Sequence, residues 1–375
     1  MLHATHQALG ARMVGFGGYD MPVQYPDGIL KEHAWTREHA GVFDVSHMGP
    51  ATLALARRGG DPEADHAAVS ALIEPLICGD IRGLAPGQLR YTLLLNQDGG
   101  ILDDLIVGRP VEPDRQGELF LVVNAGTKEA DFARIGEAAG GKAALRRLDD
   151  GGLIALQGPQ AEAVLGRLAP DVTALGFMRF ARIDLDGTPL VVSRSGYTGE
   201  DGFEVLVPAA SAEGLWSRLL ADERVRPAGL GARDSLRLEA GLPLYGHDLD
   251  ETTNPVEAGL AFALSRRRRA ARDFPGAACI LRELEDGPAR LRFGLLVEGA
   301  PAREGAEVLD GGGEPLGRIT SGGFSPTLKR PIAMAYLDPA RAQPGDAVQV
   351  VVRGRPQPAT ITALPFVPHR YARKA

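Results

Sequence analysis

Two adjacent carboxylates stand inside an otherwise apolar run. Asp103 and Asp104 follow each other in GGILDDLIV, residues 99–107, where the neighbouring side chains are aliphatic. A positioned carboxylate can transfer a proton or stabilise a developing cation, but a buried one needs hydrogen-bond partners because its desolvation is costly. Two surface acids beside a turn explain the same pattern. The run by itself does not distinguish Asp103 from Asp104.

A tyrosine is predicted to share a sheet face with one of these acids. The turn NQDGG, residues 96–100, joins two strand-like runs into a hairpin, because Asp-Gly-Gly supplies the positive φ that such turns require. If the loop holds an even number of residues, Leu93 pairs with Asp104. Side chains alternate between the faces of a strand, so Tyr91 and Asp104 then share one face and Asp103 takes the other.

A second group of acids occurs in SRSGYTGEDGFEVLV, residues 193–207. A strand that begins at Phe203 carries Glu204 at the mouth of the glycine-rich loop that contains Tyr197. The carboxylate of Glu204 can accept two parallel hydrogen bonds from a guanidine-like edge, such as the amino-pyrimidinone of a pterin. An acidic surface turn is an equal alternative, whereas the spacing does not fit a calcium loop.

Two arginines one helical turn apart suggest an anion site. Arg233 and Arg237 lie near the N-terminal end of a helix predicted over residues 229–241, where the macrodipole disfavours cations that lack a partner. The planar fork of Arg233 suits a carboxylate or a phosphate. Internal pairing with Asp234 or Glu239 is the alternative.

Other reactive side chains are isolated. His47 in FDVSHMG has no catalytic neighbour in the sequence, and we interpret it as structural. Cys78 and Cys279 each stand alone, which excludes a disulfide framework and metal-ligand spacing. The chain contains no Cys/His nucleophile pair, G-x-S-x-G motif or Walker loop. We therefore expect chemistry that depends on carboxylates, an arginine and a bound cofactor.

Composition predicts a soluble folded protein. The 375 residues carry 41 basic and 48 acidic side chains, a net charge of -7 that argues weakly against a nucleic-acid partner. No apolar run approaches the ~20 residues of a membrane span, and the first residues lack a secretion signal. With only two isolated cysteines, these features favour a cytoplasmic location.

The elements that must position these residues indicate an α+β fold. Strands are predicted at 91–96, 101–108, 118–126, 152–158 and 189–196, and helices at 28–41, 61–76, 160–170 and 229–241. These elements lack a regular βαβ alternation, which favours α+β over a doubly wound sheet.

A composition shift follows the basic run SRRRRAARDFPGA, residues 265–277. Beyond it, short strand-like runs alternate with glycine and proline, as in a small β-barrel or sandwich, so we place a domain boundary near 275–285. The four arginines 266–269 favour a solvated linker or an interface for an acidic protein over nucleic acid, because no aromatic platform accompanies them.

The whole chain resembles one enzyme family. The matching motifs run in order from end to end: GARMVGFGGYDMPVQY, GVFDVSHMG, NQDGGILDDLIV, VVNAG, LQGP, SGYTGEDGFEV, GLGARDSLRLEAGLPLYGHDLDETTNPVEAGL, TSGGFSPTLK and PFVPHRY. Together they resemble aminomethyltransferase, the T-protein of the glycine cleavage system. Tyr19 and Phe262 stand where the family often has tryptophan, and both keep an aromatic ring.

The resemblance implies an α+β, three-domain cloverleaf around a central tetrahydrofolate site. Residues 1–275 would form two interleaved α+β domains that bind folate, and residues 280–375 a C-terminal β-barrel. The family's essential aspartate falls on Asp104. The residues implied to bind the folate are Glu204, Arg233, Tyr371, Tyr91 and Tyr197.

The resemblance also implies a reaction and a partner. The family takes an aminomethyl group from the dihydrolipoyl arm of lipoylated H-protein, releases ammonia and forms methylenetetrahydrofolate, without a metal. The alternative is another tetrahydrofolate-dependent transferase or demethylase of the same superfamily. A folate-binding iron-sulfur maintenance protein is disfavoured, because neither Cys78 nor Cys279 lies in a KGCYxGQE-like motif.

Overall fold

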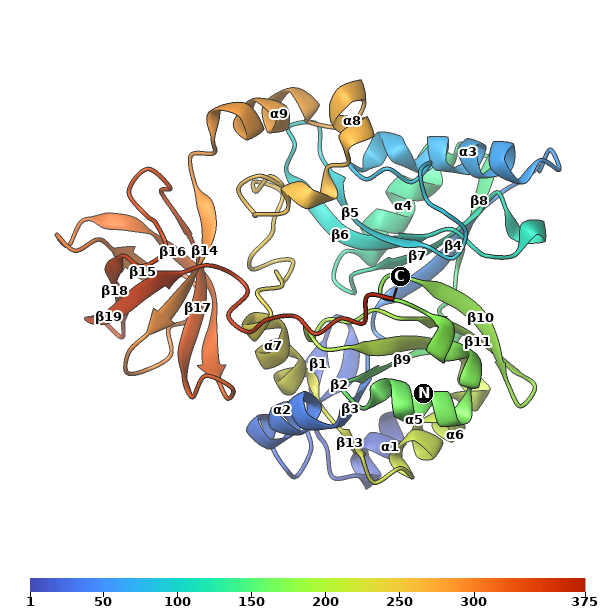
Figure 1. Ribbon diagram of the computed structural model, residues 1–375, viewed down its shortest axis with the longest axis horizontal. Helices are drawn as coiled ribbons and strands as arrows, with labels where there is room; N and C mark the ends of the chain where they lie inside the picture. Colours follow the sequence, from blue (N-terminus) through green and yellow to red (C-terminus); the bar gives the residue numbers. More distant parts are fainter. Residues whose placement is uncertain (375) are drawn as a thin grey trace.

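The chain forms three lobes, each built on its own sheet or barrel (Figure 1). The computed structural model describes residues 1–374. Helices cover the sheets of the first two lobes, and the third lobe is a closed six-stranded barrel. These observations confirm the predicted α+β class and the three-part cloverleaf with a C-terminal β-barrel.

The first lobe contains a six-stranded sheet. Its elements are α1 (His3–Ala8), β1 (Arg12–Phe16), β2 (Tyr19–Gln24), α2 (Ile29–Glu38), β3 (Ala40–Asp44), β9 (Gly151–Gln157), α5 (Ala161–Leu168), β10 (Phe180–Leu185), β11 (Thr188–Ser193), β12 (Gly202–Pro208), α6 (Ala209–Leu220), β13 (Val225–Pro227) and α7 (Leu230–Glu239). The strand order is β10-β11-β12-β9-β3-β13, and β1 and β2 form a separate hairpin. Strands β3 and β9, far apart in the sequence, are direct antiparallel neighbours (Figure 1).

The second lobe is inserted between β3 and β9. Its elements are β4 (Gly49–Leu55), α3 (Pro62–Ile73), β5 (Leu89–Leu95), β6 (Ile101–Gly108), β7 (Glu118–Val123), α4 (Lys128–Ala139) and β8 (Ala143–Arg147). The strand order is β5-β6-β7-β4-β8, so β6 lies between β5 and β7. The chain thus crosses between the first two lobes at each end of this insertion.

The connection to the barrel packs on the second lobe and contains α8 (Arg266–Ala271) and α9 (Ala277–Asp286). The side chain of Arg268 is fully buried and bonds to Asp273 and to the carbonyl of Glu74, while Arg267 pairs with Asp80 at 2.7 Å. The prediction of a solvated linker is therefore wrong for this part of the arginine run, because these guanidinium groups fasten α8 to the second lobe.

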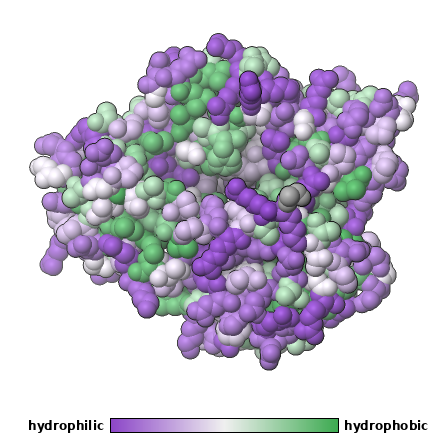
Figure 2. Space-filling view, viewed as in Figure 1, coloured by the Kyte–Doolittle hydropathy of each residue, from purple (hydrophilic) through white to green (hydrophobic). Residues whose placement is uncertain are grey.

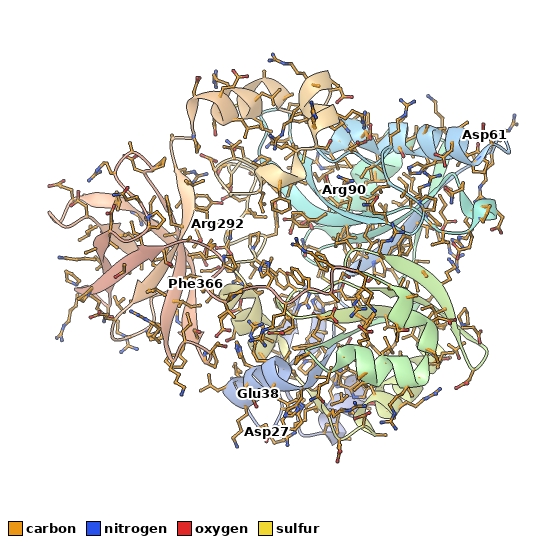
Figure 3. The ribbon with its side chains drawn as sticks, in the orientation of Figure 1. Asp27, Glu38, Asp61, Arg90, Arg292 and Phe366 are labelled. Carbon is orange, nitrogen blue, oxygen red and sulfur yellow. The ribbon has the colours of Figure 1, made fainter. Side chains whose placement is uncertain are left out.

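The barrel completes the fold. Its strands are β14 (Leu291–Val297), β15 (Glu307–Leu309), β16 (Pro315–Ser325), β17 (Arg330–Leu337), β18 (Ala347–Val352) and β19 (Arg355–Thr362), with the order β14-β17-β16-β15-β18-β19 around the barrel. Arg292 and Phe366 lie where the barrel meets the other lobes (Figure 3). Arg292 donates to the carbonyl groups of Ala258 and Gly241, which ties β14 to the segment after α7.

The last residues return from the barrel to the first lobe. The backbone N–H of Val367 donates to the carbonyl of Glu239, and that of Arg370 donates to the carbonyl of Gly199. Figure 2 shows the surface hollowed near the centre of this face, with hydrophilic side chains of the C-terminal segment crossing beside the hollow. Among the helices of residues 1–374, none has the length and apolar character needed to span a bilayer.

Candidate active site

Asp104 is held by two hydrogen-bond donors from neighbouring strands. It pairs with Leu93 across the β5–β6 ladder, as predicted, and the ladder shifts only beyond Leu94, next to the turn. The hydroxyl of Tyr91 donates to Asp104 Oδ2 at 3.0 Å. The side-chain amide of Asn124, the first residue after β7, donates to Asp104 Oδ1 at 2.7 Å. Tyr91 and Asp104 therefore share one face, as the alternation predicted.

The surroundings of Asp104 bring its titration close to neutral pH. Burial and the charge of Asp103 raise the pKa of Asp104 to about 7, and the hydrogen bonds from Tyr91 and Asn124 oppose this rise. A carboxyl group with this pKa can both accept and return a proton at neutral pH.

Asp103 faces the opposite side of β6, toward α4. Its side chain is 0% exposed and accepts hydrogen bonds from Asn124 at 3.1 Å (backbone N) and 2.9 Å (side-chain Nδ2). The interpretation as two surface acids is wrong, because β6 is an inner strand and α4 covers the face that carries Asp103. Burial and the neighbouring Asp131 raise the pKa of Asp103 well above its usual range.

Arg233 lies in the first turns of α7 with a free donor. Its guanidinium carbon lies 4.9 Å from the centre of the Tyr197 ring. Within residues 1–374, its buried Nη1 has no hydrogen-bond partner, and burial lowers the pKa of the group. The alternative of an internal pair holds for Arg237, which bonds to Asp234 at 2.8 Å and Asp248 at 2.7 Å, but not for Arg233.

Tyr197 lies near both Arg233 of the first lobe and Asp104 of the second lobe. Its hydroxyl donates to the carbonyl of Pro243. Burial raises the pKa of Tyr197, and the charges of Asp104 and Arg233 both act on it, so both groups lie near this tyrosine. The hydroxyl stays protonated at neutral pH.

Glu204 lies on β12, opposite Ser193 of β11 and Ala155 of β9. Ser195 Oγ donates to Glu204 Oε2 at 2.9 Å, and the charge of Glu204 acts on Arg233. The neighbouring acids are structural, because Glu200 is buried against Arg37 at 2.8 Å and Asp201 binds Arg194. The alternative of an acidic surface turn is therefore wrong for Glu200.

Comparisons with known proteins agree over the full length. The family model described as GCVT N-terminal domain matches residues 2–268, and that described as Glycine cleavage T-protein C-terminal barrel domain matches residues 290–368. The chain belongs to the glycine cleavage T-protein family.

Named relatives give the enzyme class. The mitochondrial aminomethyltransferase of Gallus gallus is 46% identical over 99% of this chain and 92% of its own length. That of Flaveria anomala is 41% identical over 100% of this chain and 91% of its own length. The crystal structure of the glycine cleavage system aminomethyltransferase T of Bartonella henselae superposes with a TM-score of 0.88 at 40% identity, covering 99% of this chain and 98% of the other. This T-protein is therefore an enzyme, an aminomethyltransferase.

Tyr371 lies in a separate cluster of the T-protein. Its ring stacks on Phe177 at 4.0 Å and lies 4.8 Å from His369. The adjacent Arg370 holds the loop of Tyr197 through the carbonyl of Gly199. The C-terminal segment thus supports the loop through Arg370, and a direct contact of Tyr371 with folate stays a prediction.

His47 is buried close to Arg233. Burial and the positive charges of Arg233 and Lys128 lower the pKa of His47 to about 4, so the imidazole is neutral at physiological pH. Its ring meets Phe16 edge to face at 5.3 Å. These contacts agree with the structural interpretation of His47.

The sequence reasoning missed the partners of the site acids. Asn124, Asp131 and Ser195 belong to quoted or neighbouring motifs, yet none was singled out as a site residue. A polar residue directly after the strand that neighbours β6 was the available signal for Asn124.

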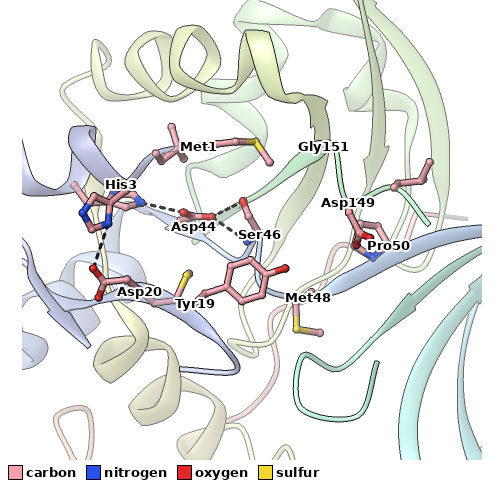
Figure 4. A pocket seen from close by; sticks show the side chains of 14 residues that line it. Met1, His3, Tyr19, Asp20, Asp44, Ser46, Met48, Pro50, Asp149 and Gly151 are labelled. Carbon is pink, nitrogen blue, oxygen red and sulfur yellow. Dashed lines mark hydrogen bonds and ion pairs between the residues drawn. The ribbon is translucent and has the colours of Figure 1, made fainter. Parts of the chain in front are cut away.

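A separate small cavity lies where the chain crosses between the first two lobes (Figure 4). Its volume is about 90 Å³, and His6 and Asp44, 2.9 Å apart, are among the residues that line it. Ser46 donates to the same aspartate at 2.5 Å and also bonds to the backbone of β9. None of the candidate site residues lines this cavity, so we assign its polar groups to the crossover between the lobes.

Proposed function

We propose that this T-protein transfers a methylene carbon from the aminomethyl-dihydrolipoyl arm of H-protein to tetrahydrofolate. The products are methylenetetrahydrofolate, ammonia and dihydrolipoyl H-protein. One observation carries the proposal: Tyr197 contacts the unpaired Arg233 and also lies near enough to Asp104, whose pKa is about 7, for the charge of Asp104 to act on it. The family membership supports the same partner and co-substrate.

The polar groups of the first lobe fit a pterin. Arg233 Nη1 is buried without a partner, and the charges of Arg233 and Glu204 act on each other although no ion pair joins them within residues 1–374. An amino-pyrimidinone edge offers N–H donors to a carboxylate and a carbonyl acceptor to a guanidinium. Glu204 and Arg233 would hold this edge, with Tyr197 beside it, and bound tetrahydrofolate would supply the nitrogen nucleophile that accepts the carbon.

Asp104 is the proposed catalytic residue. As a carboxylate it stabilises the positive charge that develops when ammonia leaves, and as an acid it supplies or removes a proton. Tyr91 and Asn124 keep the two oxygens of Asp104 in fixed orientations. The ring of Phe262, 71% exposed, stacks on the ring of Tyr91 with the centroids 5.9 Å apart. Holding tetrahydrofolate and the aminomethyl-lipoyl arm together in one site would supply much of the rate.

Dependence on H-protein tests the proposal. Methylenetetrahydrofolate and ammonia are measured with aminomethyl-loaded H-protein, with H-protein that lacks the lipoyl group, and without H-protein. We expect turnover only with the loaded form. Equal rates without H-protein, or turnover of a small methylated amine instead, would favour the alternative of a tetrahydrofolate-dependent demethylase.

Other partners and the compartment are also part of the proposal. We propose no nucleic-acid, membrane or metal partner. The cytoplasmic location stays a prediction from the sequence, whereas the plant and chicken relatives named above are mitochondrial.

A further inference from the structure

Asn124 stands between the two adjacent aspartates. Its side-chain nitrogen donates to Asp103 Oδ1 at 2.9 Å and to Asp104 Oδ1 at 2.7 Å, and it lies 2.9 Å from the carbonyl oxygen of Asp104. Its backbone N–H donates to Asp103 Oδ2 at 3.1 Å. A primary amide has two N–H donors, and here one is directed to each aspartate. Asp103 therefore determines the orientation of the amide that holds Asp104.

A third acid supports Asp103 from behind. Asp131, in the first turn of α4, is buried within hydrogen-bond reach of Asp103, and its Oδ2 has no other partner within residues 1–374. Two carboxylates buried side by side do not both ionise, so they hold one proton between them. Burial raises the pKa of both acids, and their hydrogen bond raises the pKa of Asp103 and lowers that of Asp131, so the proton lies between the two carboxyl groups.

We propose that Asp103 and Asp131, joined by one shared proton, are positioning residues for Asp104. The shared proton lets Asp103 keep its hydrogen bonds from the backbone N–H and from the side-chain amide of Asn124. At the same time, the pair of acids adds only one negative charge beside Asp104. Without Asp103, Asn124 loses the acceptor that fixes its side chain. Without the shared proton, two buried charges oppose the ionisation of Asp104. The inference rests on the proposed function, because Asp104 is the proposed catalytic group.

Few other charged groups face the pair. Asp104 comes from the same strand, Arg134 from α4, and Tyr245 from the segment that follows α7. The pKa of Tyr245 is raised to about 12 by burial and by the charges of the pair, so this phenol stays protonated. Arginine keeps its charge at all relevant pH values. Between pH 5 and about 9, the titration of this region therefore belongs to the pair and to Asp104.

Variants of Asp103 and Asp131 distinguish a role of the shared proton from a role in packing alone. We expect Asp103→Asn to lower kcat roughly tenfold, within the 10²-fold that misplacement of a reacting group can cost. The same variant moves the pKa of Asp104 in the kcat–pH profile to a lower pH, because the single negative charge of the pair then lies on Asp131 instead of on the adjacent Asp103. Asp131→Leu, which cannot donate a hydrogen bond, lowers kcat similarly, whereas Asp131→Asn supplies a neutral donor and restores most of the rate. Glu129→Gln, an exposed acid on the same helix, is the matched control.

A second readout needs no turnover. The native pair keeps a proton that the unfolded chain releases above pH ~4, so the melting temperature of the wild type falls as pH rises from ~4 toward 8. Asp131→Asn removes this shared proton and reduces the fall. Three results would each overturn the inference. The first is that Asp103→Asn has the same kcat and the same kcat–pH profile as the wild type. The others are equal rates for the two Asp131 variants, and a melting temperature that depends on pH in Asp131→Asn as it does in the wild type. Failure of the wild type to turn over would overturn the proposed function instead, and the melting data would still decide whether the proton is shared.

Discussion

Replacing Asp104 by asparagine should remove catalysis and leave the site in place. The remaining oxygen of the new amide can accept from Asn124, and its nitrogen can donate to the Tyr91 hydroxyl, so both contacts of 2.7 and 3.0 Å have a substitute. The variant loses the negative charge and the proton that titrates near pH 7. A positioned acid or base contributes about 10² or more to a rate, which equals at least ~2.7 kcal/mol of transition-state stabilisation. An exchanged neutral hydrogen bond is worth only ~1 kcal/mol, so folate binding should change little.

Single-turnover rates and folate titrations measure the two quantities separately. We expect Asp104→Asn to lower the rate at least 10²-fold, to lose the pH dependence near 7, and to keep the folate dissociation constant within about threefold. Asp98→Asn, an exposed acid in the same hairpin, serves as the control and should behave like the wild type. A rate loss below tenfold, or a rate loss explained entirely by weaker folate binding, would refute the assignment of Asp104.

Two further substitutions test the first lobe and its contact with the barrel. Arg233→Gln removes a buried cation that lacks a partner, so the ligand-free protein should melt at a higher temperature. Tetrahydrofolate should bind about 10- to 100-fold more weakly to this variant. A lower melting temperature, or an unchanged affinity by calorimetry, would contradict this. Burial raises the pKa of Glu239, but hydrogen bonds from His33, Ser325 and Thr327 outweigh burial and lower it to about 2. Glu239 also pairs with the buried Arg37 at 3.0 Å, so Glu239→Gln breaks a buried ion pair and should lower the free energy of unfolding by ~3–5 kcal/mol at pH 7 in urea titrations. The lowered pKa of Glu239 adds stability above pH ~4.5 that is lost toward pH 2. The difference in the free energy of unfolding between wild type and variant should therefore become smaller toward pH 2. A difference that stays constant with pH would contradict this account.

The sequence predicted the geometry of the hairpin because that geometry is local. Alternation along each strand and the Asp-Gly-Gly turn were sufficient to place Tyr91 and Asp104 on one face. The helix over residues 229–241 also formed within two residues at each end. These features depend on residues that are close together in the chain.

The environment of Asp103 was not predictable in the same way. What buries it is α4, whose sequence carries no sign of the sheet face that the helix covers. Its donor Asn124 lies 21 residues further along the chain, directly after the neighbouring strand β7, and its proton partner Asp131 lies further still, in α4. An acid with aliphatic neighbours is compatible with solvent or with a buried pair, and only tertiary packing decides between them.

The separation of the proposed roles between two lobes has a physical reason. The pKa of Asp104 depends on a neighbouring acid and on burial, which an inner strand of a sheet provides rigidly. A group that binds an edge of the co-substrate has the opposite requirement, since its donors must stay unpaired until the ligand arrives. Arg233 meets this requirement at the start of α7, on the other lobe, where the other acids pair with other arginines. If both sets of residues lay on one sheet, the guanidinium of Arg233 would pair with Asp104 and lower the pKa of Asp104 away from neutrality. Asp104 would then no longer exchange a proton at neutral pH, and Arg233 would no longer have an unpaired donor for the co-substrate.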